Sequence, residues 1–194
     1  MKYCFFLFLA LSLLSCSSQN NNYSDNVSQS QDNVRPVISK EEANKAFKDL
    51  YLGMPKDSTE ILGYAGYKYT PSSYELNDSL FCGVSFNSAG MLFFEDKLYD
   101  VYFFMETTTP VYYANLVKDV IISKYGNPDS CLPDDTVFGE EITEFYSWQI
   151  HNKKICSAIQ NIGSGKYGLS LSISDVILAE KREADRKDRL SKQI

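Results

Sequence analysis

Hydrophobic positions divide the chain into three parts with different patterns. Residues 4–14 are apolar except for Ser12, whereas residues 17–37 hold almost no large apolar side chain. From residue 39 onward, apolar residues recur at the spacings that are typical of helices and strands. The pattern predicts an N-terminal signal segment, a polar tether and one folded domain.

Two helices are predicted at the start of the folded domain. Ser39-x-x-Glu42 forms a capping box, which opens a helix over residues 40–51. Pro55 suits the first position of a short second helix, and Gly63 ends it. Both helices precede the strand-like part of the chain.

Strands are predicted over residues 64–107. Residues 80–86 alternate as one half-buried strand, in which Cys82 points into the core. The polar residues 95–97 separate two aromatic-rich runs and predict a hairpin turn.

The second half of the domain repeats this order. Thr109 and Pro110 open a longer helix that stops at Gly126. The apolar face expected for this helix consists of Tyr113, Leu116, Val117, Val120 and Ile121. Three strands are then predicted, over residues 143–150, 154–162 and 168–176. In the last of them Leu169, Leu171 and Ile173 alternate with serines, which indicates one buried and one polar face.

This order of elements predicts an α+β fold. Two modules of helix plus antiparallel strands, over residues 39–108 and 109–178, form a two-layer sheet-and-helix domain. Residues 179–194 predict a charged C-terminal helix that is exposed to solvent. Its expected i,i+4 ion pairs are Glu183–Lys187, Asp185–Arg189 and Asp188–Lys192.

Composition and charge narrow the classes of function. The 194 residues carry a formal net charge of −6, which argues against a nucleic-acid binder, because a polyanion needs clustered Lys and Arg. The chain has one histidine, His151, so any site that needs two histidines is excluded. We expect no metal and no cofactor.

The signal segment ends in Leu13-Leu14-Ser15-Cys16, which resembles the lipobox of bacterial lipoproteins. The resemblance implies a signal peptide over residues 1–15, a diacylglycerol on Cys16, an acylated amino group and a tether over residues 16–38. Several acyl chains give stable anchoring. Because Ser follows Cys16, the resemblance also implies that the protein is sorted to the outer membrane. The alternative is a plain secretory signal with a chance cysteine at its end.

Three motifs in the domain form a recognisable series. They are Leu52-Gly53-Met54-Pro55-Lys56, Phe94-Glu95-Asp96-Lys97-Leu98-Tyr99-Asp100-Val101 and Lys124-Tyr125-Gly126-Asn127-Pro128. The series resembles uncharacterised small lipoproteins of Gram-negative gut bacteria. It is more remotely similar to the β-lactamase-inhibitor-like fold, which a small lipoprotein of the outer-membrane β-barrel assembly machinery shares. The resemblance implies a binding or scaffolding role in the envelope.

The sequence gives little support for a catalytic site. His151 falls in an expected turn, where nothing would position it as a base. The acidic pairs Asp134-Asp135 and Glu140-Glu141 lie in a polar stretch that is typical of a solvated loop. We therefore expect a non-enzymatic binding module. The alternative is a carboxylate-based glycan hydrolase, which needs two acids converging in a cleft.

An aromatic cluster is the candidate surface for an envelope protein or glycan partner. If Val101 and Phe103 face the core, then Tyr102 and Phe104 point outward beside Asp100, and we expect Phe81 to join them. The alternative is that another element covers these rings, or that the register is shifted by one residue.

Two kinds of covalent modification are also candidates. Cys131 and Cys156 could form a disulfide in an oxidising envelope, or every thiol could stay reduced. Ser58, Ser79 and Thr136 each follow an Asp, in a pattern that resembles the acceptor of periplasmic O-glycosylation in some gut bacteria.

Overall fold

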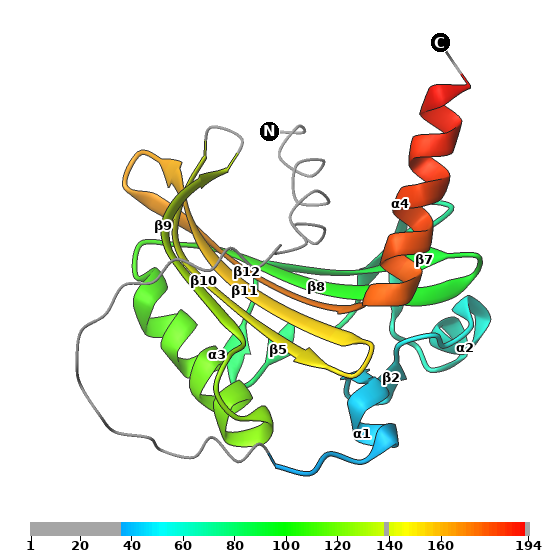
Figure 1. Ribbon diagram of the computed structural model, residues 1–194, viewed down its shortest axis with the longest axis horizontal. Helices are drawn as coiled ribbons and strands as arrows, with labels where there is room; N and C mark the ends of the chain where they lie inside the picture. The colour runs from blue at the N-terminus through cyan, green and yellow to red at the C-terminus, as the bar shows by residue number, and fades with distance from the viewer. Residues whose placement is uncertain (1–35, 138–139, 193–194) are drawn as a thin grey trace, which may run out of the picture. The chain divides into compact units, whose positions relative to one another are not determined.

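The computed structural model describes residues 36–137 and 140–192, without the side chains of residues 132–141. The expected signal peptide, the lipidation site Cys16 and almost all of the tether lie outside the described residues. Figure 1 shows the folded domain in colour.

An antiparallel sheet of eight strands forms the centre of the domain. From edge to edge its strands are β3 (Ala65–Thr70), β4 (Ser73–Leu76), β7 (Ser88–Phe94), β8 (Lys97–Thr107), β12 (Lys166–Asp175), β11 (Lys153–Gly163), β10 (Glu140–Ile150) and β9 (Ser130–Val137). Strands β8 and β12 pair at the middle of the sheet, so the first and second halves of the chain each supply one side of it.

Four helices and two small hairpins complete the described structure. The helices are α1 (Lys40–Asn44), α2 (Lys56–Ile61), α3 (Pro110–Tyr125) and α4 (Val176–Ser191). The hairpins pair β1 (Lys45–Phe47) with β2 (Leu50–Tyr51) and β5 (Leu80–Phe81) with β6 (Val84–Ser85). Figure 1 shows α1, α3 and the β5 strand on one face of the sheet, and α4 on the opposite face. The fold is therefore mixed α+β with an antiparallel sheet, as predicted.

The core lies between the sheet and α3. Val101 and Phe103 of β8 and Leu171 of β12 are at most 1% exposed, and they belong to one apolar cluster with Val117 and Ile121 of α3. We call the opposite side of the sheet the outer face. It carries Ser170, Ser172 and Ser174 of β12, so the predicted alternation of this strand is confirmed.

The helix predicted over residues 40–51 is wrong in its second half. Helix α1 ends at Asn44, and the chain then forms the β1–β2 hairpin with Lys48 at φ 49° in the turn. Ala46, Phe47 and Leu50, which the predicted helix would bury, are also buried in the hairpin. Their spacing therefore fits a helical face and a hairpin equally well.

The single strand predicted over residues 80–86 is also wrong. Cys82 and Gly83 have φ of 53° and 78° and form the two-residue turn of the β5–β6 hairpin. Cys82 is therefore a turn residue rather than a strand core residue. The turn leaves Leu80 53% exposed.

Sequence reasoning missed β9 entirely, because Pro133 and the two aspartates after it are typical of a loop. An edge strand tolerates proline, since one row of its N–H groups needs no partner in the sheet. The other predicted strands of this half agree with β10, β11 and β12 to within a few residues.

The long helix α3 has the predicted bounds, but its buried face is rotated from the predicted one. Val117 and Ile121 are buried as expected, together with Ala114 and Tyr125. Leu116 and Val120 are instead 39% and 42% exposed. Two side chains of the predicted apolar face thus remain outside the core.

The C-terminal helix α4 begins three residues before the predicted start, because the Asp175 side chain accepts a hydrogen bond from the Leu178 N–H at 3.0 Å. The three predicted i,i+4 ion pairs of this helix are confirmed. Among the described helices, none is both long and apolar enough to cross a membrane.

Candidate functional site

The predicted aromatic cluster is divided between the two faces of the sheet. Tyr102 and Phe104 lie half-buried on the outer face, on the same side of β8 as Asp100. Phe81 lies on the core side, where its ring is 5.2 Å from that of Phe103 and 6.2 Å from that of Phe47. The three rings therefore do not form one surface.

Two glycines allow the outer-face rings to lie flat on the sheet. A Cβ at Gly90 would overlap the Tyr102 ring, and a Cβ at Gly168 would lie 2.8 Å from Phe104 Cε2. Both positions therefore require glycine for close approach of an aromatic ring. Asp100 accepts a hydrogen bond from the Ser172 hydroxyl at 2.9 Å on the same face, and burial raises the pKa of its carboxyl to about 7.

The core side of the domain contains a cleft of about 280 Å³. Helix α1, strand β1 and the turn after it, the β5–β6 hairpin, the C-terminal half of α3 and the sheet all contribute to its lining. Its apolar lining residues are Ala46, Phe47, Leu80, Phe81, Val120, Ile121, Ile155 and Ile173. The cleft is near the small end of ligand sites in proteins, which span about 300–1,000 Å³.

Four lysines also line this cleft, namely Lys45, Lys48, Lys124 and Lys153. Among the described lining residues, Glu42 is the only carboxylate. It forms an ion pair with Lys124, and Lys48 forms one with Asp78 beyond the lining. The cleft therefore combines apolar walls with an excess of positive charge. We call it the lysine cleft.

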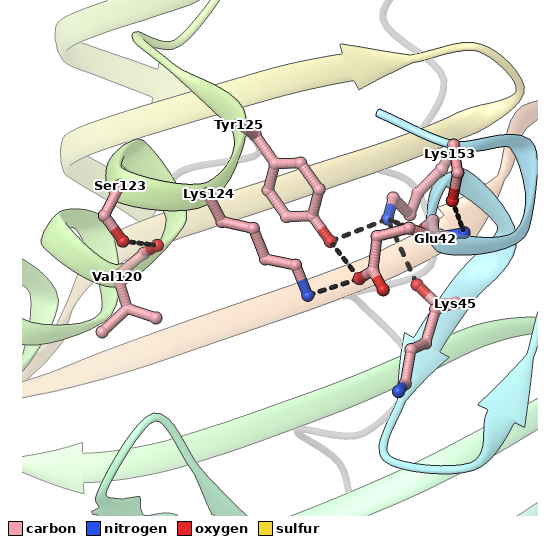
Figure 2. A network of polar contacts seen from close by, with 8 residues as sticks. Glu42, Lys45, Val120, Ser123, Lys124, Tyr125 and Lys153 are labelled. Atoms are coloured by element: carbon pink, nitrogen blue, oxygen red, sulfur yellow. Dashed lines mark hydrogen bonds and ion pairs between the residues drawn. The ribbon is translucent and has the colours of Figure 1, made fainter. Parts of the chain in front are cut away.

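A hydrogen-bonded network holds the lysine cleft at one end (Figure 2). Lys153 Nζ donates to the carbonyl oxygens of Glu42 and Lys45, at 3.1 and 3.2 Å, and to the Tyr125 hydroxyl at 3.0 Å. The Tyr125 hydroxyl in turn donates to Glu42 Oε1 at 3.5 Å. The network thus joins α1, the end of α3 and the start of β11 through one side chain, which is 1% exposed.

Burial disfavours the charged form of both Lys153 and Glu42, but for Glu42 the neighbouring lysines outweigh this effect. Burial lowers the pKa of Lys153 to about 8, while its three acceptors favour the ammonium form. The pKa of Glu42 is lowered overall, because burial, which alone would raise it, is outweighed by the hydrogen bond and charge of Lys124 and by the charges of Lys45 and Lys153. Glu42 is therefore ionised at neutral pH and suits an ion pair rather than a general acid.

Other predicted site residues lie apart from the lysine cleft. His151 is exposed in the turn between β10 and β11, at φ 51°. Within the described ranges, no group of three His, Cys, Asp or Glu side chains could hold a metal ion. Asp134, Asp135, Glu140 and Glu141 belong to β9 and β10, in the part whose side chains the structure does not describe.

Of the two alternatives for Cys131 and Cys156, the structure has the free thiols rather than the disulfide. Cys131 pairs with Tyr146 of β10, whereas Cys156 pairs with Ser147 on the opposite face of that strand. With β10 between them, their Cα atoms are about 10 Å apart by strand spacing, beyond the reach of a disulfide at about 7 Å.

The three candidate glycosylation residues have different surroundings. Ser79 is half-buried in the loop before β5, next to the Asp78 that pairs with Lys48. Ser58 is half-buried within α2, and its carbonyl accepts a hydrogen bond from Leu62 N at 3.1 Å. Thr136 lies near the end of β9, in the part without described side chains.

Comparisons with protein-family models, with curated proteins and with solved structures return no match for this chain.

Sequence reasoning missed the lysine cleft, because its lysines come from three separate parts of the chain. Lys45 and Lys48 belong to the first hairpin, Lys124 to the end of α3 and Lys153 to the start of β11. One signal was present: Lys153 is the first residue of a strand in which Ile155 and Ile159 point to the core, so it shares their face.

Proposed function

We propose that this protein is a lipid-anchored, non-enzymatic binding module of the cell envelope, which takes a small anionic ligand in the lysine cleft. The observation that carries the proposal is the lining of that cleft, which has four lysines and one carboxylate among apolar walls.

The lining of the cleft has an excess of positive charge, whereas the whole chain has a negative net charge. The protein carries a formal net charge of −6, yet four of its fifteen lysines line this cleft. A cleft with one sign of charge and apolar walls concentrates the field and favours ligands of the opposite sign. An anion with an apolar part therefore fits both features of the lining.

The envelope part of the proposal rests on the sequence before the domain. Leu13-Leu14-Ser15-Cys16 closes the apolar run in the manner of a lipobox, and a polar stretch follows it. Such a tether lets a domain bind its ligand at a distance from the membrane. We further propose that residues 39–108 and 109–178 are two modules of one kind, because each supplies a helix and four neighbouring strands of the sheet.

Lipid attachment is tested by the intact mass of the protein purified from a Gram-negative host. We expect the mass of residues 16–194 plus acyl groups, and the Cys16→Ala variant should lose those groups. A wild-type mass equal to the unmodified polypeptide would contradict the anchor.

Ligand binding is tested by chemical protection of Cys82, which lines the lysine cleft. The full-length protein in phosphatidylcholine nanodiscs is alkylated with N-ethylmaleimide, with and without octanoate, and each cysteine is followed by mass spectrometry. Octanoate should slow the labelling of Cys82 in a saturable way. Cys131, which is exposed on β9, is the internal control and should label at an unchanged rate.

Two lysine variants and one matched control give the test its specificity. Lys45→Gln and Lys48→Gln should each weaken octanoate binding about threefold to fivefold, since each removes about one favourable charge interaction. Lys166→Gln is the control, because Lys166 is also an exposed lysine paired with one carboxylate, Glu106. Absence of Cys82 protection, or an equal loss in Lys166→Gln, would overturn the proposal.

A further inference from the structure

Helix α3 presents aliphatic side chains to solvent beside the lysine cleft. Leu116 is 39% and Val120 is 42% exposed, although both occupy a spacing that is typical of a buried helix face. On the β5–β6 hairpin, Leu80 is 53% exposed. These three side chains, which we call the aliphatic strip, leave apolar surface open to solvent beside the cleft.

The aliphatic strip is continuous with the cleft. Leu80 and Val120 themselves line the cleft. Leu116 lies one turn before Val120 on α3, and Lys124, another lining residue, lies one turn after it. Leu116, Val120 and Lys124 therefore form one row along α3, with two aliphatic side chains followed by a cationic one.

We propose that the ligand of the lysine cleft is a single-chain anionic amphiphile, whose head group meets the lysines while its hydrocarbon chain covers the aliphatic strip. This inference rests on the proposed function and names the class of ligand for the same site. A carboxylate or phosphate head complements Lys45, Lys48 and Lys124. The chain would then bury apolar surface that the fold leaves open.

The arrangement argues against other classes of small ligand. A cationic amphiphile would bring like charges together at the lysines, which costs free energy. An uncharged amphiphile would cover the lysines without pairing them. A small anion without a chain would satisfy the lysines but leave the aliphatic strip exposed. A chain and a negative head are therefore both needed.

The test is a series of alkanoates on the full-length protein in phosphatidylcholine nanodiscs, with Cys82 protection as the readout. Hexanoate, octanoate, decanoate and dodecanoate differ in chain length alone. Affinity should rise about twofold to fourfold for each added methylene, until the strip is covered. Empty nanodiscs give the free concentration of each alkanoate, and dodecyltrimethylammonium gives the control for head-group charge.

Variants on opposite sides of α3 locate the chain. Val120→Thr replaces one methyl of the strip by a hydroxyl and should weaken dodecanoate about threefold to fivefold. Hexanoate should be weakened less, because its shorter chain covers less of the strip. Val111→Thr is the matched control, because Val111 is 52% exposed and lies half a helical turn away from Val120 around the axis. It should leave both affinities unchanged.

The outcomes separate this inference from the proposed function. Affinity that does not change with chain length, or equal losses in Val120→Thr and Val111→Thr, would overturn the amphiphile while preserving anion binding in the cleft. Equal protection by dodecyltrimethylammonium would overturn the anionic head. Absence of protection by every alkanoate would overturn both proposals.

Discussion

Lys153, at the start of β11, donates a hydrogen bond to the Tyr125 hydroxyl at the end of α3 (Figure 2). Lys153 Nζ lies 3.0 Å from the Tyr125 hydroxyl and 4.4 Å from the centre of the same ring. Because Nζ also binds two carbonyls of the α1 region, one cation holds three elements that line the lysine cleft. The contact thus connects stability of the domain with the shape of its candidate site.

Replacement of this lysine should destabilise the domain strongly. Lys153→Met keeps the length of the side chain but leaves the carbonyls of Glu42 and Lys45 and the Tyr125 hydroxyl without this donor. We expect a loss of about 2–4 kcal/mol in the free energy of unfolding, measured by urea denaturation near neutral pH. Lys154→Met, at the half-buried position next along the strand, is the control and should change stability by less than about 0.5 kcal/mol.

Stability should also depend on pH through Lys153. The unfolded chain keeps this proton up to about pH 10.4, whereas burial lowers the pKa in the folded protein to about 8. Between these values the unfolded state binds more protons, so the contribution of Lys153 to stability rises with pH. Wild type should gain up to about 3 kcal/mol relative to Lys153→Met between pH 7 and pH 10.5. Parallel stability curves for the two proteins would refute this assignment.

The placement of Tyr102 over Gly90 predicts a strong coupling between the two positions. Gly90→Ala introduces a Cβ that overlaps the Tyr102 ring and should cost about 1–3 kcal/mol of stability. In a Tyr102→Ala background the same change should cost less than about 0.5 kcal/mol, because the obstructing ring is gone. A double-mutant cycle measures the coupling, and additive costs would show that Tyr102 does not lie on Gly90.

Thiol titration tests the placement of the cysteines in the domain. We expect three free thiols under non-reducing conditions, from Cys82, Cys131 and Cys156. Cys131 should react first, because it is exposed, whereas burial raises the pKa of Cys82 and of Cys156 to about 11 and disfavours their reactive thiolates. A disulfide between Cys131 and Cys156 would contradict the placement of β10 between β9 and β11.

Local patterns were sufficient to predict much of the fold. Thr109, Pro110 and Gly126 mark the bounds of α3, and the alternation of β12 identifies its core face, because both signals depend on residues close in sequence. The first hairpin was mistaken for a helix, since Ala46, Phe47 and Leu50 suit both structures. Only tertiary packing distinguishes such patterns.

The candidate site could not be predicted in the same way. Lys45 and Lys153 are more than a hundred residues apart in sequence, and pairing of the strands and docking of α3 bring them to one cleft. The rotation of α3 that exposes Val120 likewise depends on which side of the helix the sheet selects. Tyr102 and Phe104 were correctly expected on the side opposite Phe103, but the hairpin turn at Cys82 placed Phe81 on the core side.

The central claim is that the lysine cleft is the place where the ligand binds. Hydrogen–deuterium exchange of the full-length protein in nanodiscs, with and without dodecanoate, tests it most directly. We expect slower exchange in residues 42–48, 80–84 and 118–125, which contribute to the cleft, and unchanged exchange in β7 and β8, which hold none of its described lining residues. Protection confined to β7 and β8, or absent from the whole domain, would contradict it.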